Sequence, residues 1–142
     1  MAATHALAII KPDAFGAGRA GRILAHLEEA GFELVAARVL QLSRADAEAF
    51  YAVHRERPFF GSLVQFMTSG PCMPMILRRD DAVTELRRVI GATDPAEAAD
   101  GTVRALYAES KERNAIHASD SDANADIEAA FFFARRDRLG SD

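Results

Sequence analysis

The amino-acid sequence predicts an α+β sandwich, in which one antiparallel sheet of four strands carries helices packed on one face. Four largely apolar runs have the composition of strands, and the stretches between them repeat apolar residues at helical spacing. A chain of 142 residues with 49% hydrophobic residues can close one well-filled core and is too short for two. No internal repeat, low-complexity tract or linker interrupts the pattern. We therefore expect residues 1–142 to form a single domain.

The first part of the chain is expected to form a strand, a helix and a second strand. Thr4 to Ile10 is apolar and partly β-branched, which predicts a buried strand ended by Pro12. Residues 20–30 place their apolar side chains on one helical face, and Gly31 stands where a helix C-terminal glycine belongs. The Val- and Leu-rich run from Phe32 to Leu42 predicts a long strand.

Two helices should follow this second strand. Ser43, with Asp46 three residues later, has the pattern of an N-cap, and apolar residues then recur at helical spacing. Pro58 occupies the first-turn position of a second helix, from Phe59 to Met67. The sequence Ser69-Gly70-Pro71 closes that helix.

The second half of the chain adds two strands and two helices around a long loop. Cys72 to Leu77 is an apolar strand, and residues 82–90 predict a helix terminated by Gly91. Residues 91–113 predict a loop with one short helical stretch near 102–109, and loops of this length are usually functional. Residues 114–119 predict the fourth strand, and Ser121 caps the last helix. The order βαββαβ with added helices is typical of ferredoxin-like folds.

Composition excludes several classes of protein. A net charge of −4 and a pI near 5.6 give no overall attraction for nucleic acids or anionic membranes. The single cysteine, Cys72, cannot form an intrachain disulfide, and four scattered histidines show no structural zinc spacing. The apolar run from Ala6 to Ile10 is too short for a signal-peptide core or a membrane span. We expect a soluble cytoplasmic protein that meets any bound anion with a local cluster of cations.

A glycine-rich segment from Gly16 to Gly21 matches the pattern G-x-G-x-x-G of dinucleotide-binding proteins. In those proteins the first glycine ends the strand, and an acidic residue follows about 20 positions later. Here Lys11 to Phe15 intervene, and residues 34–45 contain no acidic side chain. The segment is better interpreted as a turn before a helix.

His117 is the strongest candidate for a nucleophile. If residues 114–119 form a strand, His117 and Ser119 point to the same face. A carboxylate from the next helix, Glu128, can then accept the proton of one ring nitrogen and leave the other free to attack. Spacing alone does not establish that Glu128 reaches the ring, and a structural role for His117 stays open.

Cations and aromatic residues suggest where a phosphorylated ligand would bind. Lys11, Arg87 and Arg104 lie at element boundaries or in the long loop. Phosphoryl transfer depends on several such cations, although each taken alone is also compatible with a solvated surface charge. Phe59 and Phe60 belong by default to the core, and one of them can instead stack on a base.

Four stretches considered together resemble the signatures of nucleoside diphosphate kinases. They are Ala8-Ile9-Ile10-Lys11-Pro12-Asp13, Arg57-Pro58-Phe59-Phe60, Thr68-Ser69-Gly70-Pro71 and Asn114-Ala115-Ile116-His117-Ala118-Ser119-Asp120-Ser121. The similarity runs with matching spacing from about Thr4 to Phe133. It implies transfer of the γ-phosphate of a nucleoside triphosphate to a diphosphate, through a phosphohistidine and with broad base specificity.

The resemblance also implies a role for each matched residue. His117 would be phosphorylated on Nδ1, with Glu128 bonded to the other nitrogen and Ser119 supporting Glu128. The nucleotide contacts would come from residues that hold phosphates, sugar or base, namely Lys11, Tyr51, Phe59, Arg87, Thr93, Arg104 and Asn114. Asp120 would assist Mg²⁺ through water, and the loop from Gly91 to Arg104 would form one wall of the nucleotide cleft.

Three positions depart from the family pattern. Ala118 and Glu112 replace frequent glycines, and Lys111 stands where the family often has an aliphatic residue against the base. The substrates implied are nucleoside di- and triphosphates, including ATP, GTP, ADP and GDP, and the family forms homo-oligomers. Two alternatives remain, a nucleotide-binding module without catalysis and a nucleic-acid-binding protein, and the acidic balance argues against the second.

Overall fold

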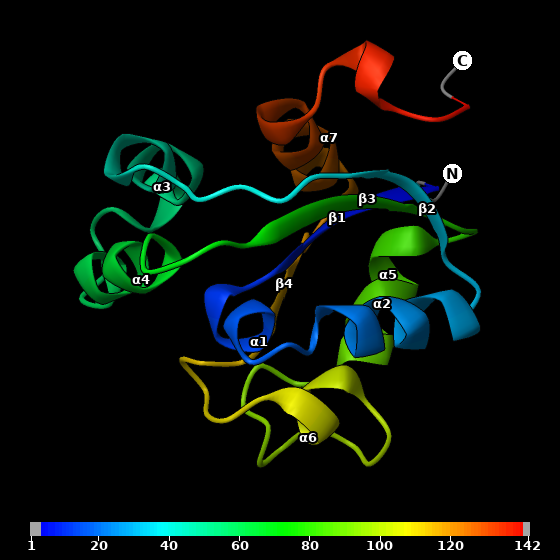
Figure 1. Cartoon of the computed structure of the whole chain (residues 1–142), viewed down its shortest axis with the longest axis horizontal. Helices are drawn as coiled ribbons and strands as arrows, with labels where there is room; N and C mark the ends of the chain where they lie inside the picture. Colours follow the sequence, from blue (N-terminus) through cyan, green and yellow to red (C-terminus); the bar gives the residue numbers. More distant parts are fainter. Residues whose placement is uncertain (1–3, 141–142) are drawn as a thin grey trace.

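The computed structural model of the protein describes residues 4–140, which contain a four-stranded sheet in the order β2-β3-β1-β4 (Figure 1). Strand β1 pairs antiparallel with both β3 and β4, and β2 pairs antiparallel with β3. This confirms the antiparallel sheet and the ferredoxin-like order predicted from sequence. The strands are β1 (His5–Ile10), β2 (Glu33–Ala37), β3 (Met73–Arg78) and β4 (Ile116–Ala118).

The helices fall close to the predicted positions, with one addition at the end of β1. Two short 3₁₀ helices, η1 (Ala52–His54) and η2 (Arg135–Asp137), also occur. The α-helices of the described chain are α1 (Pro12–Gly16), α2 (Ala20–Glu29), α3 (Arg44–Phe50), α4 (Phe60–Met67), α5 (Ala82–Ile90), α6 (Val103–Tyr107) and α7 (Asp122–Phe132).

Helices cover both faces of the sheet, so the prediction that they pack on one face is wrong. Alternate residues of β1 join different apolar clusters. Ala6, Ala8 and Ile10 belong to the cluster that includes residues of α2 and α5, whereas Leu7 and Ile9 belong to the cluster that includes residues of α3, α4 and α7. Figure 1 shows α2 and α5 on one side of the sheet and α7 on the other. Because β1 is apolar at consecutive positions, both of its faces require a covering layer.

Strand β2 ends at Ala37, which makes it shorter than the predicted run to Leu42. Its ladder with β3 shifts register between Leu34 and Ala36. The N–H of Arg38 still donates to the carbonyl of Pro74, at 3.2 Å, but proline has no N–H to return the bond. Pairing resumes only as an isolated bridge between Leu40 and Cys72.

Helix α1 was not predicted, because Pro12 was interpreted only as the end of a strand. Pro12 also occupies the first turn of α1, where its missing N–H removes no helical bond. The glycine-rich segment begins at the end of α1, and a turn at residues 17–18 then leads towards α2. The interpretation of this segment as a turn before a helix is therefore confirmed.

Helix caps fix the loops that later carry the site. The hydroxyl of Ser43 accepts from the Asp46 N–H, and Ser121 caps α7 in the same way, as predicted. Gly91 ends α5 with φ of 91°, and a Cβ there would lie 2.6 Å from Thr102 Oγ1. A residue larger than glycine would therefore force the end of α5 away from Thr102, the N-cap of α6. No helix between residues 4 and 140 has the length and apolar character needed to cross a membrane.

Candidate active site

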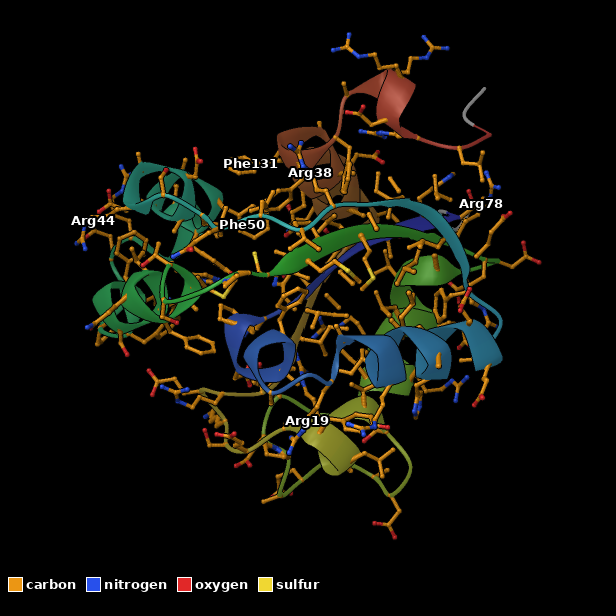
Figure 2. All side chains as sticks on the ribbon, viewed as in Figure 1. Arg19, Arg38, Arg44, Phe50, Arg78 and Phe131 are labelled. Carbon is orange, nitrogen blue, oxygen red and sulfur yellow. The ribbon has the colours of Figure 1, made fainter. Side chains whose placement is uncertain are left out.

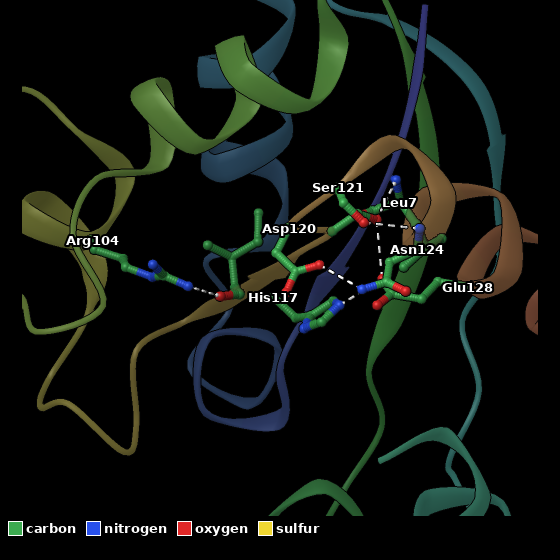
Figure 3. A network of polar contacts seen from close by, with 9 residues as sticks. Leu7, Arg104, His117, Asp120, Ser121, Asn124 and Glu128 are labelled. Atoms are coloured by element: carbon green, nitrogen blue, oxygen red, sulfur yellow. Dashed lines mark hydrogen bonds and ion pairs between the residues drawn. The ribbon is translucent and has the colours of Figure 1, made fainter. Parts of the chain in front are cut away.

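His117 lies in the middle of β4, opposite Ile9, and its side chain is 20% exposed. Its Nε2 is 2.8 Å from Oε1 of Glu128, which comes from α7 (Figure 3). A carboxylate can only accept hydrogen bonds, so we assign the Nε2 proton to this contact. In a neutral ring Nδ1 then carries the lone pair, and it has no hydrogen-bond partner within residues 4–140.

Ser119 contacts the carboxylate of Glu128 and fixes its position. The fully buried Ser119 Oγ is 3.0 Å from Glu128 Oε1 and accepts the N–H of Leu7 at 3.1 Å. His117 and Ser119, two residues apart, therefore reach the same carboxylate oxygen. Because Leu7 belongs to β1, this network anchors the histidine partner to the centre of the sheet.

Aromatic rings surround the imidazole on its α3 side. Phe50 meets the ring of His117 edge-on at 5.4 Å between centroids, and Tyr51 does so at 6.2 Å. Phe50 and Phe131, both labelled in Figure 2, also meet edge-on, with ring centroids 5.3 Å apart. The Tyr51 hydroxyl is buried without a hydrogen-bond partner among the described residues, and burial followed by the Glu128 charge raises the Tyr51 pKa. A buried, protonated hydroxyl of this kind is costly unless a ligand accepts from it.

Lys11 follows β1 directly and is buried beside the start of β4. Its Nζ donates to Asn114 Oδ1 at 2.8 Å, and Asn114 Nδ2 donates to the carbonyl of Thr93 at 3.2 Å. Burial, followed by the charge of Arg104, lowers the Lys11 pKa to about 8, and Asp13 partly opposes this shift. The cation is therefore held where bound anionic oxygens would stabilise it.

The side chain of Arg104 forms hydrogen bonds with both the start of the long loop and strand β4, which carries His117. Nη1 donates to the carbonyl of Gly91 at 3.0 Å. Nη2 donates to the carbonyl of Ile116 at 2.7 Å (Figure 3). Its Nε is buried without a partner within residues 4–140. Burial and then the charge of Arg87 lower the Arg104 pKa to about 10. The guanidinium of Arg104 is thus fixed to the backbone of Ile116, the residue that precedes His117.

A strained residue brings Lys11 and Asn114 together. Ala115 has φ of 74°, which costs a residue with a Cβ roughly 1–2 kcal/mol. Its carbonyl accepts from the Lys11 N–H at 2.9 Å, and its own N–H donates to Asp13 Oδ2 at 3.0 Å. Strain of this kind concentrates at functional sites. Sequence reasoning missed Asp13, although its place in the Lys-Pro-Asp stretch was a usable signal.

Several predicted residues lie farther out and are exposed. Arg87 and Thr93 line a hollow of about 530 Å³ beside the long loop. Phe59 is 47% exposed at the start of α4, with its ring 5.4 Å from that of His54. Asp120 Oδ1 accepts from Asn124 at 2.7 Å; this bond, assisted by Arg87, lowers the Asp120 pKa. Asp120 therefore carries a stable negative charge near the cations.

The predicted residues thus divide into two parts, which we name the floor and the rim. The floor is mostly buried and consists of Lys11, Tyr51, Arg104, Asn114, His117, Ser119 and Glu128. The rim is mostly exposed and consists of Phe59, Arg87, Thr93 and Asp120. Ala118, one of the departures from the family pattern, lies in β4 outside the residues of positive φ, so its methyl group causes no backbone strain.

An open imidazole nitrogen beside buried cations, on a ferredoxin-like sheet, is the arrangement of a phosphotransferase that works through histidine. The chain belongs to the nucleoside diphosphate kinase family, whose sequence model matches residues 4–138. It is an enzyme that transfers the γ-phosphate of a nucleoside triphosphate to a nucleoside diphosphate, through a phosphohistidine and with broad base specificity.

Relatives of known name and structure cover nearly the whole chain. A nucleoside diphosphate kinase of Chlorobium chlorochromatii is 56% identical over 135 residues, which are 95% of this chain and 96% of the relative. The crystal structure of the Aquifex aeolicus nucleoside diphosphate kinase has a TM-score of 0.94 and 41% identity, and covers 96% of this chain and 99% of its own. The structure of a Halobacterium salinarum nucleoside diphosphate kinase in complex with CDP has a TM-score of 0.92 and 34% sequence identity. The match covers 97% of this chain and 92% of that structure's chain.

Proposed function

We propose that His117 is the residue phosphorylated during transfer, and that Nδ1 is the attacking atom. The observation that carries this proposal is the 2.8 Å contact between Nε2 and Glu128 Oε1, because it leaves Nδ1 as the free nitrogen. Glu128 stabilises the cation that forms when the ring gains a phosphoryl group, and Ser119 holds Glu128 in position.

The cations of the site bind the transferred phosphoryl group and its neighbours. Lys11 and Tyr51 contact the reacting phosphate and the sugar hydroxyl, and the unpartnered Tyr51 hydroxyl supports this role. Arg87, Thr93 and Arg104 hold the remaining phosphates. In Arg104 two nitrogens are already fixed by backbone carbonyls, so its charge is presented without further ordering.

The remaining contacts bind sugar and base without reading the base. Asn114 binds the ribose 3′-hydroxyl, and Phe59 stacks on the base with its exposed ring. Stacking accepts any base, which agrees with the broad base specificity of the family. The substrates are nucleoside di- and triphosphates, such as ATP, GTP, ADP and GDP.

Magnesium fits this site as a partner of the phosphates. No cluster of three or more His, Cys, Asp or Glu side chains within residues 4–140 could hold a metal ion. Asp120 is exposed and charged, so it suits a water-mediated contact with an ion held mainly by the nucleotide. Bound Mg²⁺ would neutralise part of the phosphate charge.

The two half-reactions form and then break a single bond to Nδ1 of His117. Nδ1 attacks the γ-phosphorus, the bond from that phosphorus to the bridging oxygen breaks, and the diphosphate leaves with the electron pair. In the second half a terminal oxygen of another diphosphate attacks the same phosphorus, and the P–N bond breaks. The lone pair returns to Nδ1, and Lys11 and Arg104 offset the charge spread over the transferring group.

Assembly, location and domain structure complete the proposal. Residues 1–142 act as a single domain in a homo-oligomer, for which the exposed apolar side chains Ile127 and Phe131 provide contact surface. A cytoplasmic location is supported by the buried free thiol of Cys72, since unpaired cysteines are typical of reducing compartments.

Labelling with γ-³²P-ATP tests the nucleophile. The protein should acquire a phosphoryl group that is labile in acid and stable in base, and addition of GDP should release it as labelled GTP. His117→Ala should take up no label. Label of the same stability in that variant would move the nucleophile to another residue.

A further inference from the structure

One contact joins the two segments that border the base-binding end of the site. The Ser62 hydroxyl of α4 donates to Glu112 Oε1, across 50 residues of sequence. Ser62 lies three residues after Phe59, so both occupy the same face of the chain at the start of α4. Glu112 follows Lys111 and precedes Asn114 by two residues. The contact therefore links the base platform to the segment that holds the ribose.

A second contact joins the same two segments. The guanidinium of Arg113 lies over the ring of Phe66, 5.2 Å from its centroid. Ser62, Phe66, Glu112 and Arg113 all line one hollow of about 330 Å³ between α4 and residues 108–113. Glu112 thus makes a polar contact and Arg113 a cation–π contact with successive turns of α4.

The segment itself is a compact turn, so the contacts act on it as a unit. The carbonyl of Arg113 accepts from the N–H groups of Glu109 and Ser110, at 3.0 and 3.2 Å. Its far end is anchored, because Asn114 accepts from the buried Lys11. With that end fixed, the Ser62–Glu112 contact controls how far residues 108–113 stand from α4.

We propose that Ser62 and Glu112 form a positioning pair that holds the base-binding end of the cleft at the width of a nucleoside base. This inference rests on the proposed role of Phe59 as the stacking residue. The pair acts on nucleotide binding without touching the reacting phosphate.

The test compares kcat and KM for GDP and CDP in four variants, with ATP as donor. Glu112→Ala and Ser62→Ala should each raise both KM values by about threefold, the effect of one partly exposed hydrogen bond, and leave kcat within about twofold. Glu112→Gln should retain the wild-type KM, because its amide oxygen still accepts from Ser62. Glu109→Ala is the matched control, since it removes an acidic side chain of the same turn that forms no side-chain hydrogen bond or ion pair within residues 4–140.

Amide hydrogen exchange adds a readout that needs no substrate. In Glu112→Ala the N–H groups of Glu109 and Ser110 should exchange faster than in the wild type, and in Glu112→Gln they should not. Unchanged KM and unchanged exchange in Glu112→Ala would overturn the pair, as would equal effects in Glu109→Ala. These outcomes leave the transfer function intact, whereas labelling of His117→Ala would overturn the proposed nucleophile instead.

Discussion

The floor and the rim of the site are built in different ways. On the floor, buried side chains are tied to the sheet: Lys11 to Asn114, Arg104 to two carbonyls, and His117 to Glu128. At the rim, Phe59 and Arg87 are exposed, and the ring of Phe59 makes a tilted contact with that of His54. Polar contacts are therefore concentrated on the floor, where the proposed mechanism moves the phosphoryl group and where misplacement of reacting atoms would slow transfer most.

Electrostatics follows the same division. Lys11 and Arg104 are both buried and poorly solvated, and this burial lowers the pKa of Lys11 to about 8 and that of Arg104 to about 10. Charges in such surroundings interact strongly with a bound phosphate, whereas exposed Arg87 is screened by water and salt. In the proposed mechanism the floor therefore provides transition-state stabilisation, and the rim mainly provides binding.

The largest effect among the following substitutions is expected at Glu128. Glu128→Ala removes the partner of Nε2, so either ring nitrogen can carry the proton and the ring loses its orientation. We expect transfer to slow by about 10²-fold or more, the typical contribution of a positioned proton partner. Single-turnover phosphorylation of the enzyme by ATP measures this step directly. A rate equal to that of the wild type would remove Glu128 from the mechanism.

The Kd for ADP should depend on pH through the charge of the buried Lys11. Because the Lys11 pKa is lowered to about 8, the free enzyme loses this positive charge as the pH rises through 8. Phosphate binding favours the protonated form, so the Kd for ADP should rise above pH 8, by at most about tenfold per pH unit. Calorimetric titration with ADP between about pH 7 and 9.5 measures this Kd as a function of pH.

Lys11→Arg provides the control for this pH dependence. Arginine keeps its charge over the whole range, so the Kd of that variant should stay nearly constant above pH 8. The same rise in both proteins would assign the pH dependence to another group.

The smallest effect is expected at the rim. Phe59→Ala removes an exposed stacking face, and we expect KM for all diphosphates to rise about fivefold, since stacking on an aromatic ring stabilises a base by about 1–3 kcal/mol and exposure reduces this. The kcat should change by less than about twofold, because Phe59 is remote from the phosphoryl group. A loss of kcat equal to that of Glu128→Ala would erase the distinction between floor and rim.

The sequence predicts the local parts of this structure well. Ser43 and Ser121 cap helices as expected, and Gly91 ends α5, because such signals depend on a few neighbouring residues. The length of β2 could not be predicted in the same way. It depends on the pairing of Arg38 with Pro74, residues far apart in the chain.

The layers of the sheet were predictable in principle. Ala6 to Ile10 is apolar at every position, which is the pattern of a strand covered on both faces, so helices on one face alone could not have buried it. Spacing alone made His117 a candidate nucleophile without establishing that Glu128 reaches its ring, and resemblance to a family supplied the proposed roles of His117 and Arg104. The carbonyl contacts of Arg104 with Gly91 and Ile116 depend on tertiary packing, which a single sequence does not reveal.

The chemical identity of the phosphorylated nitrogen tests the central claim most directly. Protein containing ¹⁵N-labelled histidine can be phosphorylated with ATP and analysed by ³¹P and ¹⁵N NMR without denaturation. Nδ1 of His117 should show the one-bond coupling to phosphorus, and Nε2 should keep the proton shared with Glu128. Coupling to Nε2 of His117, or to a nitrogen of any other histidine, would contradict the account.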